Sequence, residues 1–287
     1  MTLFTWQRLS SISRSFAQIF LALIISFCNT APSFAGPSEP SARQQASNEA
    51  LAKKTQNPVS DLISVPLQNN FNFGLGPEDK MAWVMNVQPV IPVRVSEDWN
   101  IITRTILPVI NVPSLAPGMD SAAGIGDLNS TFFLSPANPS RFIWGVGPTM
   151  TFPTATDSLL GDGKWSAGPA AVGLLMEGPW VVGALAHQQW SLAGWDDRAV
   201  NQFLTQPFIN YNFPTGWYLS SSPIITADFE SQPGNQWTVP LGVGFGKVHK
   251  YFGVPININF APYYNVVTPD DGASWQARFT FAMLFPE

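Results

Sequence analysis

The chain of 287 residues is 11% charged, and its 14 basic and 19 acidic residues give a formal net charge of −5. Soluble domains are about a quarter charged. Yet no stretch beyond the N-terminal region approaches the roughly 18 consecutive apolar residues of a membrane helix. An acidic balance with no basic cluster excludes an ordinary nucleic-acid-binding protein. Few charges without long apolar runs are typical of a membrane β-barrel, in which apolar and polar residues alternate.

The first 35 residues have the three parts of a secretory signal peptide. Arg8 and Arg14 supply the positive region, Ala17–Phe27 is the apolar run, and Ser33-Phe34-Ala35 offers small residues at the cleavage positions. The apolar run is shorter than the about 20 residues that a spanning helix needs, which disfavours an uncleaved anchor. We expect residues 1–35 to be a signal peptide cleaved after Ala35.

Cys28 is the only cysteine of the chain and lies within this signal. A lipoprotein with a lipidated Cys28 is disfavoured because the bulky Phe27 directly precedes it. The mature chain is therefore expected to contain no disulfide, although an exported protein could use one.

Residues 36–68 are expected to form a periplasmic N-terminal segment. Up to about Gln56 the segment is polar and rich in Pro, Ser, Ala and Gln, and Asn48–Lys54 has the composition of a short helix. Asp61–Gln68 is placed to fold into the lumen of a following barrel as a partial plug.

Residues 69–287 are predicted to form an all-β domain, a transmembrane antiparallel up-and-down barrel of about twelve strands. The last strand shows the pattern most clearly, because every second residue from Trp275 to Phe285 is apolar, whereas Gln276, Arg278 and Thr280 lie between them. Side chains alternate across a strand, so one face would contact lipid and the other would line the lumen.

The joins between the predicted strands alternate between short and long. Pro113–Ala123, Pro153–Gly163 and Leu192–Val200 are the longer ones. Short periplasmic turns and longer outer loops are the rule for such barrels, which places both termini in the periplasm.

Eight tryptophans are expected to form aromatic girdles at the two membrane borders. Trp99, Trp180 and Trp217 would lie on the periplasmic side, and Trp83, Trp165, Trp190, Trp237 and Trp275 on the outer side.

The main objection to this prediction is proline, which cannot donate to a strand ladder. Ten prolines lie inside the predicted strands: Pro89, Pro92, Pro108, Pro148, Pro169, Pro207, Pro223, Pro240, Pro255 and Pro262. We therefore expect shortened or bulged strands, or a strand count that is off by two.

Three arginines, Arg94, Arg104 and Arg278, fall on predicted lumen faces. They could form a basic constriction that favours anionic solutes. Alternatively they could form salt bridges to lumen carboxylates such as Asp127 or Glu177, and the need to balance buried charge favours this second interpretation.

His187 also falls on a predicted lumen face, beside Gln189 and Ser191. A hydrolase would need a nucleophile and an orienting group next to this histidine, and the sequence has no local signature of either. With no cysteine in the mature chain and only two histidines, neither a metal site nor a cofactor is expected.

Several strings resemble a family of outer-membrane transporters named after the meta-cleavage pathway of phenol degradation. They are NPVSDLISVPLQNNFNFG from Asn57, QPVIPV from Gln88, GDLNSTFFLSP from Gly126, GVGPTMTFPTAT from Gly145, QPFINYNFPTGWYL from Gln206 and WTVPLGVGFGKV from Trp237. The resemblance spans Asn57–Phe285 and includes prolines at these strand positions. It implies an outer-membrane β-barrel with a proposed role in uptake of small, aromatic compounds, and it carries no catalytic or binding motif. One departure is that Pro286 and Glu287 follow the aromatic Phe285.

The function expected from these observations is passive uptake of small solutes, aromatic or hydrophobic ones among them, across the outer membrane of a Gram-negative bacterium. The expected partners are outer-membrane lipids, the solute and the barrel assembly machinery. The two alternatives are a barrel enzyme that hydrolyses lipid or peptide, and a structural or adhesive barrel that does not conduct.

Overall fold

The computed structural model describes residues 42–195, 198–251 and 254–285. The predicted signal peptide, its predicted cleavage position and the first part of the N-terminal segment therefore lie outside the described residues. Among the described residues, no helix is both long enough and apolar enough to cross a bilayer.

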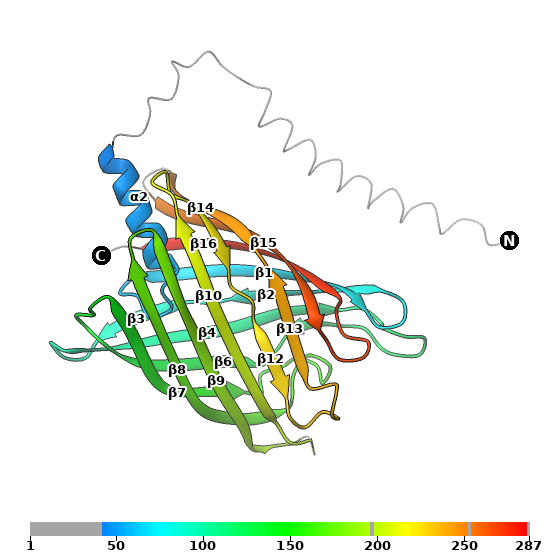
Figure 1. Cartoon of the computed structure of the whole chain (residues 1–287). Coiled ribbons are helices and arrows are strands. Elements are labelled where there is room, and N and C mark those ends of the chain that lie inside the picture. Colours follow the sequence, from blue (N-terminus) through cyan, green and yellow to red (C-terminus); the bar gives the residue numbers. More distant parts are fainter. Residues whose placement is uncertain (1–41, 196–197, 252–253, 286–287) are drawn as a thin grey trace, which may run out of the picture. The chain divides into compact units, whose positions relative to one another are not determined.

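In the part of the chain that the structure describes, helix α2 (Ala42–Thr55) precedes sixteen β segments (Figure 1). The segments are β1 (Ile63–Leu75), β2 (Lys80–Val87), β3 (Val90–Arg94), β4 (Trp99–Val112), β5 (Ala122–Ile125), β6 (Leu128–Pro136), β7 (Phe142–Phe152), β8 (Lys164–Glu177), β9 (Trp180–Gly194), β10 (Asn201–Asn212), β11 (Trp217–Ser221), β12 (Ile225–Asp228), β13 (Trp237–Gly242), β14 (Gly244–Tyr251), β15 (Val254–Val267) and β16 (Trp275–Phe285).

The sixteen segments make twelve strands of one closed antiparallel barrel. The pairs β2 and β3, β5 and β6, β11 and β12, and β13 and β14 are each a single interrupted strand, since both members pair with the same neighbour. The last segment, β16, pairs with both β15 and β1, which closes the sheet. The prediction of a twelve-strand up-and-down barrel is therefore confirmed.

The alternation read from the sequence separates the two faces of the barrel wall. In β16, Trp275, Phe279 and Phe285 are 40 to 47% exposed on the outer face, whereas Arg278 and Leu284 are almost fully buried on the inner face. The other strands also expose large apolar side chains outward. Only a bilayer covers an apolar surface of this extent around a closed barrel, so the fold is that of a transmembrane barrel.

The barrel begins earlier than the sequence pattern indicated. Ile63–Gln68 belongs to β1 and pairs with β16, from Ile63 opposite Phe285 to Gln68 opposite Thr280. The prediction that Asp61–Gln68 folds into the lumen is therefore wrong for all but its first two residues. Ile63, Val65 and Leu67 alternate with the inward Ser64, Pro66 and Gln68, so the period of two continues to the start of β1.

The prolines are accommodated at breaks in the pairing. Pro89 and Pro223 lie where two of the twelve strands are interrupted. Pro148 and Pro169 stand opposite each other in β7 and β8. Beside them, the β6–β7 and β8–β9 ladders each skip residue pairs. A proline still keeps its acceptor, and the Pro108 carbonyl accepts from the Gly126 N–H at 2.9 Å.

The two ends of the barrel differ. At one end, called the α2 end here, short turns such as Gly178-Pro179 and 213–216 join the strands. At the other end, called the loop end, the joins 113–121, 153–163 and 229–236 are longer. The difference matches the alternation of loop lengths expected from the sequence.

The breaks at proline bring neighbouring backbones close together, and glycine is required there. A Cβ atom added to Gly168 would overlap the carbonyl oxygen of Gln188, whereas one added to Gly173 would lie at an ordinary 3.4 Å from the Phe142 ring. We expect Gly168→Ala to destabilise the barrel by about 1–3 kcal/mol through overpacking, measured by urea unfolding in detergent. Gly173→Ala is the matched control, and equal stability of the two variants would contradict this account.

Candidate functional site: the barrel lumen

A helix and a short connecting segment fill part of the lumen at the α2 end. Leu51 and Ala52 of α2 are buried against side chains from four surrounding segments: Leu62, Tyr218, Val248, Ala282 and Leu284. The last turn of α2 continues into Gln56–Leu62, and we call Ala42–Leu62 the plug.

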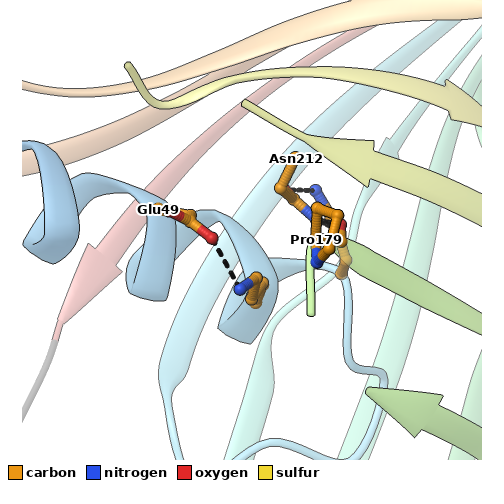
Figure 2. Close-up of polar contacts among 5 residues, drawn as sticks. Glu49, Pro179 and Asn212 are labelled. Atoms are coloured by element: carbon orange, nitrogen blue, oxygen red, sulfur yellow. Dashed lines mark hydrogen bonds and ion pairs between the residues drawn. The ribbon is translucent and has the colours of Figure 1, made fainter. Parts of the chain in front are cut away.

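A reciprocal amide pair fixes the plug to the barrel wall. The Gln56 Nε2 donates to Asn212 Oδ1 at 2.8 Å, and the Asn212 Nδ2 donates to Gln56 Oε1 at 3.0 Å. Asn212 is 2% exposed and also donates to the Pro179 carbonyl at 3.1 Å. Figure 2 shows Asn212 beside Pro179, next to α2, on which Glu49 lies. These bonds hold the segment that follows α2 against β10.

A tight turn points Val59 into an apolar pocket. The Asn57 Oδ1 accepts from the Val59 N–H at 2.9 Å, and the Asn57 carbonyl accepts from the Ser60 N–H at 3.3 Å. Val59 then packs in a cluster of inward-facing residues that includes Ile102, Phe133, Leu174, Val181 and Phe208. Gly145 provides the space, because a Cβ there would lie 3.3 Å from Val59 Cγ1. Burying this valine contributes about 1.5–3 kcal/mol to holding the plug.

The remaining part of the lumen is polar. A cavity of about 190 Å³ lies beside the plug. Its lining includes amide, hydroxyl and guanidinium groups, among them Gln68, Gln88, Asn210, Asn257, Arg104 and Arg278. The lumen therefore has an apolar side occupied by the plug and a polar side that contains this cavity.

Arg278 is held in this polar side by neutral groups alone. Its guanidinium donates to Asn70 Oδ1 at 3.2 Å, to the Ser222 carbonyl at 2.7 Å and to Gln276 Oε1 at 3.1 Å. It also lies 4.6 Å above the Tyr263 ring. Among the described residues, no carboxylate forms a salt bridge with it.

Arg104 is the second cation of the lumen and is partly buried. Its Nη2 donates to Gln88 Oε1 at 3.1 Å, and within the described ranges it too has no carboxylate within salt-bridge distance. The expectation that the lumen arginines pair with Asp127 or Glu177 is therefore wrong. Glu177 instead pairs with Arg141 at an exposed turn, at 2.9 Å. The polar cavity consequently carries positive charge that no neighbouring carboxylate compensates.

Arg94, by contrast, lies at the rim of the barrel. It is exposed at the end of β3, and it donates to the Ser96 carbonyl at 3.1 Å and to the Glu97 carbonyl at 3.0 Å. The structure brings Arg104 and Arg278 to one cavity but leaves Arg94 in the turn that follows its strand, because the strand ends at that residue.

His187 is on β9 and has a buried Nδ1 without a hydrogen-bond partner in the described structure. It borders a cavity of about 510 Å³ toward the loop end, together with Leu204, Thr226 and Asp228. A catalytic histidine is oriented by a hydrogen bond that its Nδ1–H donates to a third group, and the Nδ1 of His187 has no such partner among the described residues.

Asp127 organises a loop that folds over the mouth at the loop end. Its carboxylate accepts from the Ala155 N–H at 3.0 Å and from the Asp162 N–H at 2.7 Å. Leu160 of the same loop is 5% exposed. The Gln202 Nε2 donates to Asp162 Oδ2 at 3.3 Å. Burial, followed by the charge of Asp127, raises the pKa of the Asp162 carboxyl above its usual range. The mouth of the lumen thus carries the carboxylates of Asp127 and Asp162, with Arg198 lining the same cavity.

The predicted tryptophans lie on the outer face of the barrel. Seven of them, Trp99, Trp165, Trp180, Trp190, Trp217, Trp237 and Trp275, are 36 to 47% exposed. Trp83 is partly buried and donates from Nε1 to Asn69 Oδ1 at 3.2 Å. Trp99, Trp180 and Trp217 begin strands at the α2 end, whereas Trp165, Trp237 and Trp275 lie near strand starts at the loop end.

Sequence reasoning missed the plug contacts, the neutral partners of the arginines and the role of the loop. A local signal for the plug turn was present, because Asn57-Pro58 is a turn-forming dipeptide. No local signal could have paired Gln56 with Asn212, since 156 positions separate them.

The barrel was compared with known proteins. It is similar to the COG4313 outer membrane channel from Pseudomonas putida F1, with a TM-score of 0.60 and 16% identity over 78% of this chain and 94% of that one. It is also similar to the NanC porin, with a TM-score of 0.50 and 9% identity over 78% of this chain and the whole of that one. No protein-family model matches the chain, and a search of curated proteins finds no relative. At such identities the likeness establishes the fold.

The plug should detach when its apolar anchor is made polar. In Val59→Asn, the new amide would lie in an apolar cluster with no assured partner, at a cost of about 1–3 kcal/mol. We expect a higher single-channel conductance than in the unmodified protein, measured in planar bilayers. Asp61→Asn, at an exposed position in the same segment, is the control. An unchanged conductance in Val59→Asn would contradict the role assigned to Val59.

The mouth loop should respond to acid through Asp162. The raised pKa of Asp162 means that the folded loop disfavours the ionised carboxylate. The loop is therefore destabilised at a pH above this pKa, and the destabilisation is relieved as the pH falls through it. We expect residues 153–163 to gain protection from hydrogen exchange on acidification, after correction for the intrinsic rate. Asp162→Asn should remove this dependence, and Asp157→Asn in the same loop should keep it. Identical profiles for Asp162→Asn and the unmodified protein would refute the assignment.

Proposed function

We propose that the chain is an outer-membrane channel for passive entry of small solutes, with a preference for those that carry a negative charge. The observation that carries the proposal is the pair of lumen cations, Arg104 and Arg278, which are held by amide and carbonyl oxygens rather than by carboxylates. A desolvated cation without a counter-ion attracts an anion, and rings or patches of arginine give pores anion selectivity.

The size and lining of the lumen support small cargo. The polar cavity of about 190 Å³ accommodates a small molecule while the plug is in place. Tyr263 lies against Arg278 on the same side and offers an aromatic face. A small aromatic carboxylate would use both features, which agrees with the aromatic compounds implied by the family resemblance. The COG4313 protein and NanC are named as an outer membrane channel and a porin.

The loop lengths support one orientation in the membrane. Short turns lie at the α2 end and longer loops at the other end, which supports a periplasmic α2 end and an external loop end. In this orientation a solute passes the mouth first and the two arginines next, and the plug stands before the periplasm. Export by a signal cleaved near Ala35 and insertion by the barrel assembly machinery are parts of the same proposal.

A barrel that does not conduct is the second candidate, because the plug is well anchored by Val59 and by the Gln56–Asn212 pair. A conductance that stays at baseline even in Val59→Asn would favour this candidate over the channel.

Ion selectivity tests the role of the arginines. With a salt gradient across a planar bilayer, the reversal potential of the unmodified protein should have the sign that indicates a preference for anions over cations. Arg104→Gln and Arg278→Gln should each reduce the ratio of anion to cation permeability several-fold, because each removes one uncompensated lumen charge. Arg141→Gln, at an exposed turn, should leave the ratio unchanged. A cation-preferring unmodified pore, or equal ratios in all four proteins, would overturn the proposed selectivity.

A further inference from the structure

The outer wall of the barrel carries a groove in which a cation lies beside aromatic side chains. It has a volume of about 400 Å³ and is lined by Trp217, Phe245, Lys247, His249, Ile258, Phe260 and Phe279, together with Gly246. These residues come from β11, β14, β15 and β16, which are neighbours in the barrel. Phe245, Phe260 and Phe279 are 40 to 50% exposed, so the groove opens outward.

Lys247 is unusual for its position. Within the described strands, Lys247 is the only lysine or arginine that points outward from the wall and does not lie at a strand end. Charge on the outer wall is costly except near the membrane border. Its Nζ lies 4.9 Å from the centroid of the Trp217 ring. In the described part of the chain no carboxylate forms a salt bridge with it.

The groove has a polar end and an apolar end. Along β14, the outward residues are Phe245, Lys247 and His249, in order toward the α2 end. Lys247 pairs with Trp217 and Ile258, and Phe245 pairs with Phe260, which itself pairs with Phe279. Val248, beside Lys247, packs inside the barrel against α2, so this is the α2 end. The cation therefore lies at the membrane border and the aromatic rings lie deeper.

This order matches an amphiphile with an anionic head and hydrocarbon tails. We propose that the groove binds one anionic glycerophospholipid of the periplasmic leaflet, with the phosphate beside Lys247 and an acyl chain along Phe245, Phe260 and Phe279. The site rests on the membrane orientation proposed above but not on conductance. Charge complementarity and the position at the membrane border select this occupant over an uncharged lipid.

Native mass spectrometry of the purified barrel, titrated with phosphatidylglycerol or phosphatidylethanolamine of equal acyl chains, tests the site. One lysine near the surface strengthens binding of an anionic lipid about fivefold. We therefore expect phosphatidylglycerol to bind about fivefold more tightly in the unmodified protein. Lys247→Gln should abolish this preference, whereas Lys247→Arg should keep it. Phe279→Ala should weaken the binding of both lipids to the same extent.

Two controls separate the groove from the general surface. The first control is Lys250→Gln, because Lys250 lies on the same segment and is exposed at the α2 end. The second is Phe132→Ala, which removes an outward aromatic side chain from β6. Both should behave as the unmodified protein. Retention of the preference in Lys247→Gln, its absence from the unmodified protein, or tighter binding of lipid A through Lys247 would overturn the proposal. Because binding is measured without ion flux, these results are independent of whether the barrel conducts.

Discussion

In hydrocarbon, each backbone N–H and C=O group needs a partner within the protein, and this requirement dictates the architecture. The pairing of β16 with β1 meets it by leaving the described sheet without a free edge. Once the sheet is closed, the period of two along each strand assigns every residue to lipid or to lumen. The outward tryptophans and the inward amides are consequences of that assignment.

Closure also creates an interior that must be filled. A twelve-strand barrel is too wide for its own side chains to pack across the lumen, and this chain fills one side with its N-terminal segment. Val59 meets Ile102, Phe133 and Leu174, so the apolar inner residues of β4 to β9 form a core with the plug. The opposite side, lined from β1, β15 and β16, keeps polar residues and a small cavity. One lumen thus combines a plug with a polar cavity.

The charges are distributed along the same axis. Asp127 and Asp162 lie at the loop end, Arg104 and Arg278 lie deeper, and Lys247 lies outside the wall near the α2 end. Each cation is held by groups that do not neutralise it: amide oxygens, a backbone carbonyl or an aromatic ring. Such cations remain available to an anion, which links the proposed solute preference inside the barrel with the proposed lipid site outside it.

The sequence by itself determined the barrel, its number of strands and the outward tryptophans. It could do so because alternation with a period of two is a local property, visible in Trp275–Phe285 without knowledge of any neighbour. The start of β1 was placed too late, although Ile63, Val65 and Leu67 alternate with Ser64, Pro66 and Gln68 as the rest of the strand does. Only the tertiary structure decided the partners of Arg104 and Arg278, the contact of Val59 and the pairing of Gln56 with Asn212. Those interactions join strands that the closed barrel brings together from distant parts of the chain, and no local pattern specifies which side chains meet across a lumen.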